Sequence, residues 1–115
     1  MLIVEDDGDI RQVLAAIVES AGYLVETAHD GVQALERLRS GPHCLIIFDL
    51  MMPGMNGWDL AKHLKADADL AKIPTVILTA RNDVADVQAA LAPAAIIRKP
   101  FDADEVLKLL ERFCP

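Results

Sequence analysis

Carboxylates follow directly after two short apolar runs of this sequence. Glu5 and Asp6 come after the run 2–4, and Asp49 comes after the run 44–48. Carboxylates that lie close together need a cation, and oxygen ligands without histidine or thiolate favour a hard divalent ion. Mg²⁺ suits such a site because it takes few protein ligands and leaves room for waters and phosphate oxygens. The pattern predicts phosphoryl chemistry, with Asp49 as the nucleophile because it stands alone at the end of its strand.

Two further polar residues end apolar runs later in the chain. Thr79 follows the run 75–78, and Lys99 follows the run 94–97 by two positions. A threonine at a strand end or an aspartate before a helix has an ordinary structural explanation when it is taken alone. Together with an acidic cluster, the Thr79 hydroxyl is predicted to hydrogen-bond a phosphoryl group and the Lys99 ammonium to pair with it. Phosphorylation would then pull on the loops that carry both residues, which makes a switch.

These residues need a scaffold that brings distant strand ends together. We predict strands in the ranges 2–4, 23–28, 44–48, 75–78 and 94–97, alternating with helices 10–21, 32–38, 58–65, 82–91 and 103–113. Strands that alternate with helices indicate an α/β fold with a parallel sheet and helices on both faces. The mixed polar and apolar segment 23–28 is predicted to be an edge strand, which gives a doubly wound five-stranded sheet of order 2-1-3-4-5. Its first and third strands are neighbours at the switch point, so Glu5, Asp6 and Asp49 should converge there.

Composition narrows the class of protein. The 115 residues suit one domain, 1–115, and no apolar run is long enough to cross a bilayer. The start of the chain has no signal-peptide pattern, and the formal net charge of -7 argues against direct nucleic-acid binding. Cys44 and Cys114 are far apart and form no CxxC pair, so we predict two free thiols and a cytoplasmic protein without a membrane partner.

Four segments carry a resemblance to a known family. The segments 2–7, 49–57, 73–80 and 99–101 resemble the receiver domain of bacterial two-component response regulators, and the resemblance covers essentially the whole chain. It implies a flavodoxin-like receiver that accepts a phosphoryl group on Asp49 from a sensor histidine kinase or a phosphotransfer protein.

The resemblance also implies a role for each site residue. Mg²⁺ would be held by Glu5, Asp6, Asp49 and the backbone carbonyl of Met51. By position, Thr79 resembles the switch hydroxyl and Lys99 resembles the phosphate-pairing lysine. Asp7 falls outside the acidic pair and is predicted to cap the first helix. The downstream effector is open, and we expect a monomer or a weak dimer.

Three positions depart from the pattern of the family. Ile96 stands where receivers commonly have an aromatic residue that reports phosphorylation, so aromatic switching in its usual form is in doubt. The interval from Thr79 to Lys99 is 20 residues, which is short, and 92–95 replaces the usual turn before the last strand. The fourth helix and its output face are therefore expected to be short, displaced or mobile. Arg81 lies two residues past Thr79, where we predict that it alters the lifetime of the acyl phosphate.

Two other function classes stay open at this point. A phosphatase of the haloacid dehalogenase type also uses an aspartyl phosphate, but it needs a second aspartate two residues after the first, where this chain has Met51. A pseudo-receiver would keep the fold as an interaction module and lose phosphorylation. The chain could equally be a stand-alone receiver or a part of a longer regulator or hybrid kinase.

Overall fold

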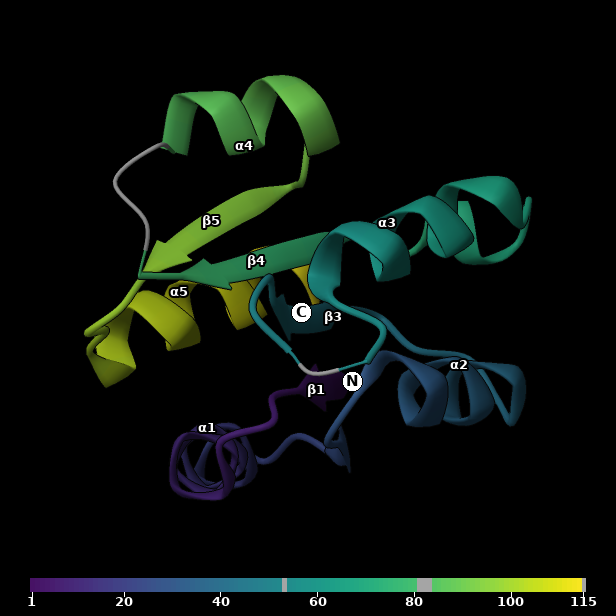
Figure 1. Ribbon diagram of the computed structural model, residues 1–115. Helices are drawn as coiled ribbons and strands as arrows, with labels where there is room; N and C mark the ends of the chain where they lie inside the picture. Colours follow the sequence, from purple (N-terminus) through teal and green to yellow (C-terminus); the bar gives the residue numbers. More distant parts are fainter. Residues whose placement is uncertain (53, 81–83, 115) are drawn as a thin grey trace.

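The computed structural model of this chain describes residues 1–52, 54–80 and 84–114, and Figure 1 shows their arrangement. The described residues form a parallel sheet of five strands in the order β2-β1-β3-β4-β5, which confirms the predicted topology. The strands are β1 (Leu2–Val4), β2 (Glu26–Ala28), β3 (Ile46–Asp49), β4 (Thr75–Thr79) and β5 (Ala95–Arg98). The helices of the described residues are α1 (Gly8–Ser20), α2 (Gly31–Arg39), α3 (Gly57–Ala66), α4 (Val84–Leu91) and α5 (Ala103–Phe113), and η1 (Leu70–Lys72) is a 3₁₀ turn.

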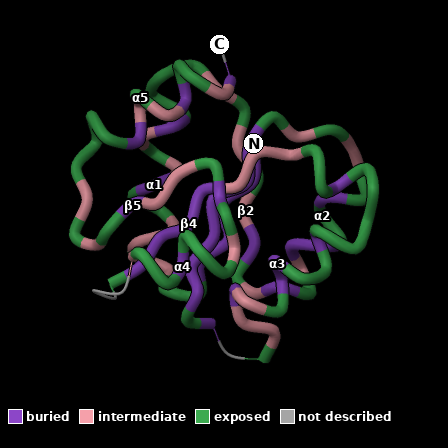
Figure 2. The backbone as a smooth tube through the Cα atoms, turned by 90° about the horizontal axis from the view of Figure 1, so that it is seen from above, coloured by how far each residue is buried: buried purple, intermediate pink, exposed green. Residues whose placement is uncertain are grey.

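The helices cover the two faces of the sheet as two separate layers. On one face, Ile46 and Phe48 of β3 pack with apolar residues of α2, α3 and α4. On the other face, Ile47 packs with Leu14 of α1 and Val106 of α5. Successive side chains of a strand point to opposite faces, so a strand buried on both faces reads as an unbroken apolar run. The buried residues accordingly gather along the strands, and the outer sides of the helices are exposed (Figure 2).

Side-chain caps fix where the helices begin. The Asp7 carboxylate accepts hydrogen bonds from the backbone N–H groups of Asp9 and Ile10, at 2.9 and 3.2 Å, which confirms the predicted cap of α1. The Asp102 carboxylate accepts from the N–H of Glu105 at 3.0 Å and caps α5. These bonds satisfy N–H groups that have no partner within the first turn.

The predicted bounds of most elements differ from the observed ones by a few residues, and positions 82–83 of the predicted fourth helix lie outside the described residues. The edge strand spans only Glu26–Ala28, and residues 23–25 form the connection from α1. The alternation of polar and apolar residues marks half-burial, and it does not show where ladder pairing starts. Helical spacing predicts Val32, Leu35 and Leu38 on the inner face of α2, but Val32 is 55% exposed. Leu35 and Leu38 are buried as predicted, together with Ala34, and Val32 lies beside this stripe.

The prediction of free thiols is also wrong. Cys44, two residues before β3, and Cys114, directly after α5, form a disulfide with their Cα atoms 5.7 Å apart. The two residues are 70 positions apart in the sequence. The tertiary path of the chain explains the contact, because α5 packs in the same apolar cluster as Ile47 of β3 and ends near the residue that precedes this strand. Spacing along the chain therefore carried no sign of this pair.

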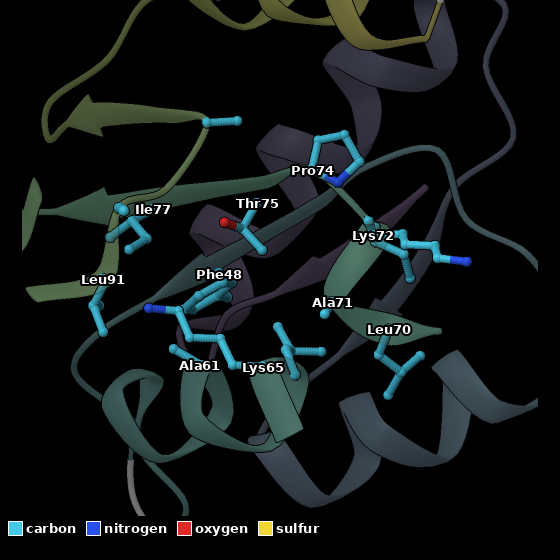
Figure 3. A pocket seen from close by; sticks show the side chains of 14 residues that line it. Phe48, Ala61, Lys65, Leu70, Ala71, Lys72, Pro74, Thr75, Ile77 and Leu91 are labelled. Atoms are coloured by element: carbon cyan, nitrogen blue, oxygen red, sulfur yellow. The ribbon is translucent and has the colours of Figure 1, made fainter. Parts of the chain in front are cut away.

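The short fourth helix leaves a hollow beside it. Ala92, directly after α4, has a φ of 45°, a left-handed conformation in the place where glycine often ends a helix. A cavity of about 280 Å³ lies between α3, η1 and the end of α4, with Phe48 and Ile77 among the lining residues. In Figure 3 the Lys65 side chain lies along this cavity. It opens near the amino end of β4, which is the end of the sheet away from Asp49. Within the described ranges, no helix has the length and apolar character to cross a bilayer.

Candidate functional site

Three carboxylates meet where the two central strands end. β1 and β3 are neighbours with Val4 opposite Phe48, so the next residues, Glu5 and Asp49, emerge side by side. Glu5, Asp6 and Asp49 each offer an oxygen atom, and these oxygens lie within 4.8 Å of one another. Glu5 and Asp49 are buried, whereas Asp6 is exposed. Oxygen donors at this spacing fit a hard divalent cation such as Mg²⁺, with an open side for further ligands.

Lys99 supplies a positive charge inside this acidic cluster. Its backbone N–H donates to the carbonyl oxygen of Thr79 at 2.9 Å, which places the residue just past the end of β5. Its Nζ atom donates to Oδ2 of Asp49 and lies 3.3 Å from Oε1 of Glu5. Burial alone would lower the pKa of the Lys99 ammonium, but its hydrogen bond and attraction to Asp49, followed by Glu5, outweigh burial and raise that pKa. The lysine is therefore charged in the folded protein.

The environment of the Glu5 carboxyl group opposes its ionisation. Burial of the side chain, then the neighbouring Asp49, raise the pKa of Glu5 to about 7, and the attraction of Lys99 only partly offsets them. A glutamate with such a pKa is partly protonated near neutral pH. A divalent cation would reverse this balance, because the cation stabilises the ionised form.

The loop after β3 holds the second oxygen of Asp49. The backbone N–H of Met51 donates to Oδ1 of Asp49 at 2.9 Å, so the Met51 backbone lies beside the carboxylates, although the residue as a whole is 67% exposed. The loop returns to α3, where the N–H of Gly57 donates to the Leu50 carbonyl oxygen at 3.0 Å. The Asn56 side chain caps α3 through the N–H of Asp59 at 3.0 Å. These three hydrogen bonds hold the turn that positions the carboxylate of Asp49.

Thr79 ends β4 and is buried, on the strand next to β3. Ile96 is half-buried and packs against the core that α2, α3 and α4 cover. Arg81 lies outside the described residues, so its predicted effect on the acyl phosphate stays a prediction.

Sequence reasoning missed Arg11, whose Nη1 atom donates to the backbone oxygen of Glu5 at 2.7 Å. Its place in the first turn of a helix that starts at the acidic cluster was the available signal.

Comparison with known proteins places this site in a family. The family model described as "Response regulator receiver domain" matches residues 1–111. The chain belongs to the response regulator receiver domain family. The receiver shares 37% identity over 109 residues with "Response regulator MprA" of Mycobacterium ulcerans, and the match covers 93% of this chain and 46% of that protein. "DNA-binding response regulator MtrA" of Mycobacterium tuberculosis also matches at 37% identity, over 93% of this chain and 46% of that protein.

A solved structure agrees with the family assignment. The chemotaxis response regulator CheY4 of Vibrio cholerae superposes on this receiver with a TM-score of 0.88 at 32% identity. The match covers 97% of this chain and 95% of CheY4. The receiver therefore spans about half the length of the curated relatives and nearly all of CheY4. Receivers of this family occur in bacterial two-component signalling. The family match and the superposition confirm the predicted family and fold class.

Proposed function

We propose that this receiver accepts a phosphoryl group on Asp49 from a phosphohistidine of a sensor kinase or a phosphotransfer protein. One observation carries the proposal: the buried Asp49 carboxylate lies between Lys99 and two further carboxylates, at the switch point of a doubly wound sheet. Residues 1–115 act as one receiver domain in this proposal. The domain catalyses only its own phosphorylation and dephosphorylation, and it works in the bacterial cytoplasm, where the kinase domains that supply such groups lie.

The transfer is an in-line displacement at phosphorus. An oxygen of the Asp49 carboxylate attacks the phosphorus, the phosphorus–nitrogen bond breaks, and its electron pair stays on the donor imidazole. Lys99 shifts from the carboxylate to the oxygens of the transferred group, and the Thr79 hydroxyl donates to another of them. The product is an acyl phosphate on Asp49 that three separate strands contact.

Glu5, Asp6, Asp49 and the Met51 carbonyl would hold Mg²⁺ in this reaction. The ion, when it is bound, neutralises the charge that develops on the phosphoryl oxygens. Glu5 must be ionised for this task, and its raised pKa indicates that the cation and a proton compete for it. Arg11 holds the Glu5 backbone and so positions the first carboxylate of the set.

The new charge at Asp49 supplies the switch. Thr79 and Lys99 end different strands, so contacts from both to one dianion draw the loops after β4 and β5 toward β3. A downstream effector, as yet unidentified, would read this rearrangement, whether it is another protein or a further domain. The half-buried Ile96 would respond as an aliphatic side chain rather than by turning an aromatic ring.

Intact mass after incubation with acetyl phosphate and Mg²⁺ tests the proposal. We expect one added phosphoryl group, which is lost in Asp49→Asn and in the presence of EDTA. Asp59→Asn, an exposed carboxylate of the neighbouring helix, is the matched control and should be phosphorylated like the wild type. A folded protein that gains no mass under any condition would instead favour a phosphorylation-independent interaction module. Release of inorganic phosphate from unrelated phosphoesters at many turnovers would favour a phosphatase.

A further inference from the structure

The disulfide between Cys44 and Cys114 joins two elements that serve different parts of the receiver. Cys44 lies just before β3, the strand that ends at Asp49, and Cys114 closes the last turn of α5 with its N–H on the Leu110 carbonyl oxygen at 2.7 Å. The bond therefore fixes the end of α5 to the central strand. It is separate from the acidic cluster, because Cys44 and Asp49 lie at opposite ends of β3.

The two sulfur-bearing residues differ in their access to solvent. Cys114 is only 6% exposed, whereas Cys44 is exposed. Cys44 also lines a hollow of about 610 Å³ at the amino end of the sheet, together with Tyr23, Leu24 and His43. A hollow of this size admits a small thiol. An incoming thiolate is therefore expected to reach Cys44 more easily than the buried Cys114.

The segment that carries Cys44 is anchored independently of the disulfide. The His43 side chain is 2% exposed, its Nε2 atom is 2.9 Å from Oε1 of Glu26, and its Nδ1 atom is 3.0 Å from the Gly41 carbonyl oxygen. Cys114, in contrast, follows the last residue of α5. Cleavage of the disulfide should therefore leave Cys44 in place and loosen the end of α5.

From this asymmetry we propose that Cys44 and Cys114 form a reversible redox site that clamps α5 to β3 and exchanges with external thiols at Cys44. A thiolate attacks the Cys44 sulfur, the disulfide breaks, and its electron pair passes to the Cys114 sulfur, which takes up a proton. A second thiol then attacks the mixed disulfide and releases Cys44, so two thiols are oxidised to one disulfide while the protein gains two thiols. Oxidised glutathione reverses the sequence. The site does not depend on phosphorylation of Asp49.

Alkylation after equilibration in glutathione buffers tests the redox site. We expect no alkylated cysteine per native chain in oxidised glutathione and two in an excess of reduced glutathione, with full return on reoxidation. Reduction should lower the Tm by about 5 °C or more, because the disulfide restrains the unfolded chain over a long loop. A Cys44→Ser/Cys114→Ser variant should show the same Tm in both buffers. Two alkylated thiols in oxidised glutathione would overturn the proposal, and so would a native disulfide that resists reduced glutathione but yields when the chain is denatured.

Trapping the first intermediate tests the entry point, and hydrogen exchange tests the clamp. When the native disulfide reacts with reduced glutathione and the reaction is quenched with acid early, the mixed disulfide should lie on Cys44 about tenfold more often than on Cys114, because only Cys44 of the two is exposed while the disulfide is intact. Equal amounts of the two mixed disulfides, or an excess on Cys114, would overturn exchange at Cys44. Hydrogen exchange of the Cys114 amide should accelerate on reduction relative to the amides of α1. An unchanged Cys114 amide would overturn the clamp.

Discussion

A Cβ atom added at Gly57 would lie 2.5 Å from the carbonyl oxygen of Asp49 and 2.6 Å from the Cα atom of Leu50. The start of α3 and the backbone of the phosphoacceptor therefore approach more closely than any residue with a side chain allows. Both neighbours are backbone atoms, so they cannot yield by changing a rotamer.

Gly57→Ala should therefore displace the loop after β3. We expect a loss of about 1 to 3 kcal/mol in the free energy of unfolding and weaker Mg²⁺ binding, measured by urea denaturation and by calorimetric titration. Gly41→Ala is the matched control, because a Cβ atom at Gly41 meets nothing within 4 Å. Equal stabilities of the two variants would contradict the close approach at Gly57.

The neighbouring residues Asp6 and Asp7 should respond in opposite ways to alanine. Asp7→Ala removes the cap of α1 and should cost about 1 kcal/mol of stability, with Mg²⁺ affinity unchanged within about twofold. Asp6→Ala should lower Mg²⁺ affinity about tenfold or more and leave the metal-free protein at least as stable, because it relieves repulsion among the carboxylates. Thermal melts with and without Mg²⁺ separate the two effects. A loss of Mg²⁺ affinity in Asp7→Ala would show that the cap interpretation is incomplete.

Lys99 should act as a competitor of the metal. Its ammonium contacts Asp49 and Glu5, so Lys99→Met leaves two buried carboxylates without a cation. We expect the metal-free variant to lose about 1 to 3 kcal/mol of stability at pH 8, and its Mg²⁺ affinity to rise about fivefold or more. Lys62→Met, an exposed lysine of α3, is the control for loss of one charge. Calorimetric titration measures the affinity, and an unchanged value would exclude competition.

The stability of the metal-free protein should depend on pH through Glu5. The pKa of this group is about 7 in the folded protein and near its ordinary value of 4.5 in the unfolded chain. Between these two pKa values the folded protein keeps a proton on Glu5 that the unfolded chain has lost. This proton binding stabilises the folded state, and the stabilisation is fully present below about pH 4.5 and is lost as the pH rises through about 7. Its size is on the order of 3 kcal/mol, since the two pKa values differ by about 2.5 and one pKa unit corresponds to about 1.4 kcal/mol.

Urea denaturation in EDTA from pH 4.5 to 8 measures this effect. Glu5→Gln cannot ionise, so the difference in stability between wild type and variant should shift in favour of the variant as the pH rises. Glu36→Gln, an exposed position of α2, should give a difference that does not depend on pH in this way. A Glu5→Gln difference that stays constant between pH 5 and 7 would contradict the raised pKa.

Much of the fold followed from periodicity and from the order of the elements. The unbroken apolar run before Asp49 indicated a strand buried on both faces, and that assignment fixed the centre of the sheet. The carboxyl ends of neighbouring parallel strands lie at the same edge of a sheet. The strand order alone was therefore enough to predict that Glu5 and Asp49 lie close together. The ends of the strands were harder to predict from the sequence. Residues 23–25 have a strand-like composition, but pairing with β1 begins only at Glu26.

What the sequence could not supply were contacts set by the tertiary path of the chain. The hydrogen bond of Arg11 to the Glu5 backbone depends on how α1 leaves the end of β1. The pairing of Cys44 with Cys114 depends on the direction and length of α5, and reasoning from the cellular compartment pointed to free thiols instead. The raised pKa of Glu5 likewise follows from burial, which no residue type reveals by itself.

The disulfide also decides where a mechanical load would go. Without this bond, a pull on Cys114 would detach α5 from the sheet one turn at a time, because α5 packs on the sheet through the apolar side chains of Val106 and Leu110. With the covalent bond to Cys44, the same pull acts first on the root of β3. β3 lies between β1 and β4, so the tension spreads over backbone ladders on both of its edges. In the oxidised state the applied force would therefore have to break the backbone hydrogen bonds of the sheet. In the reduced state it would first detach α5.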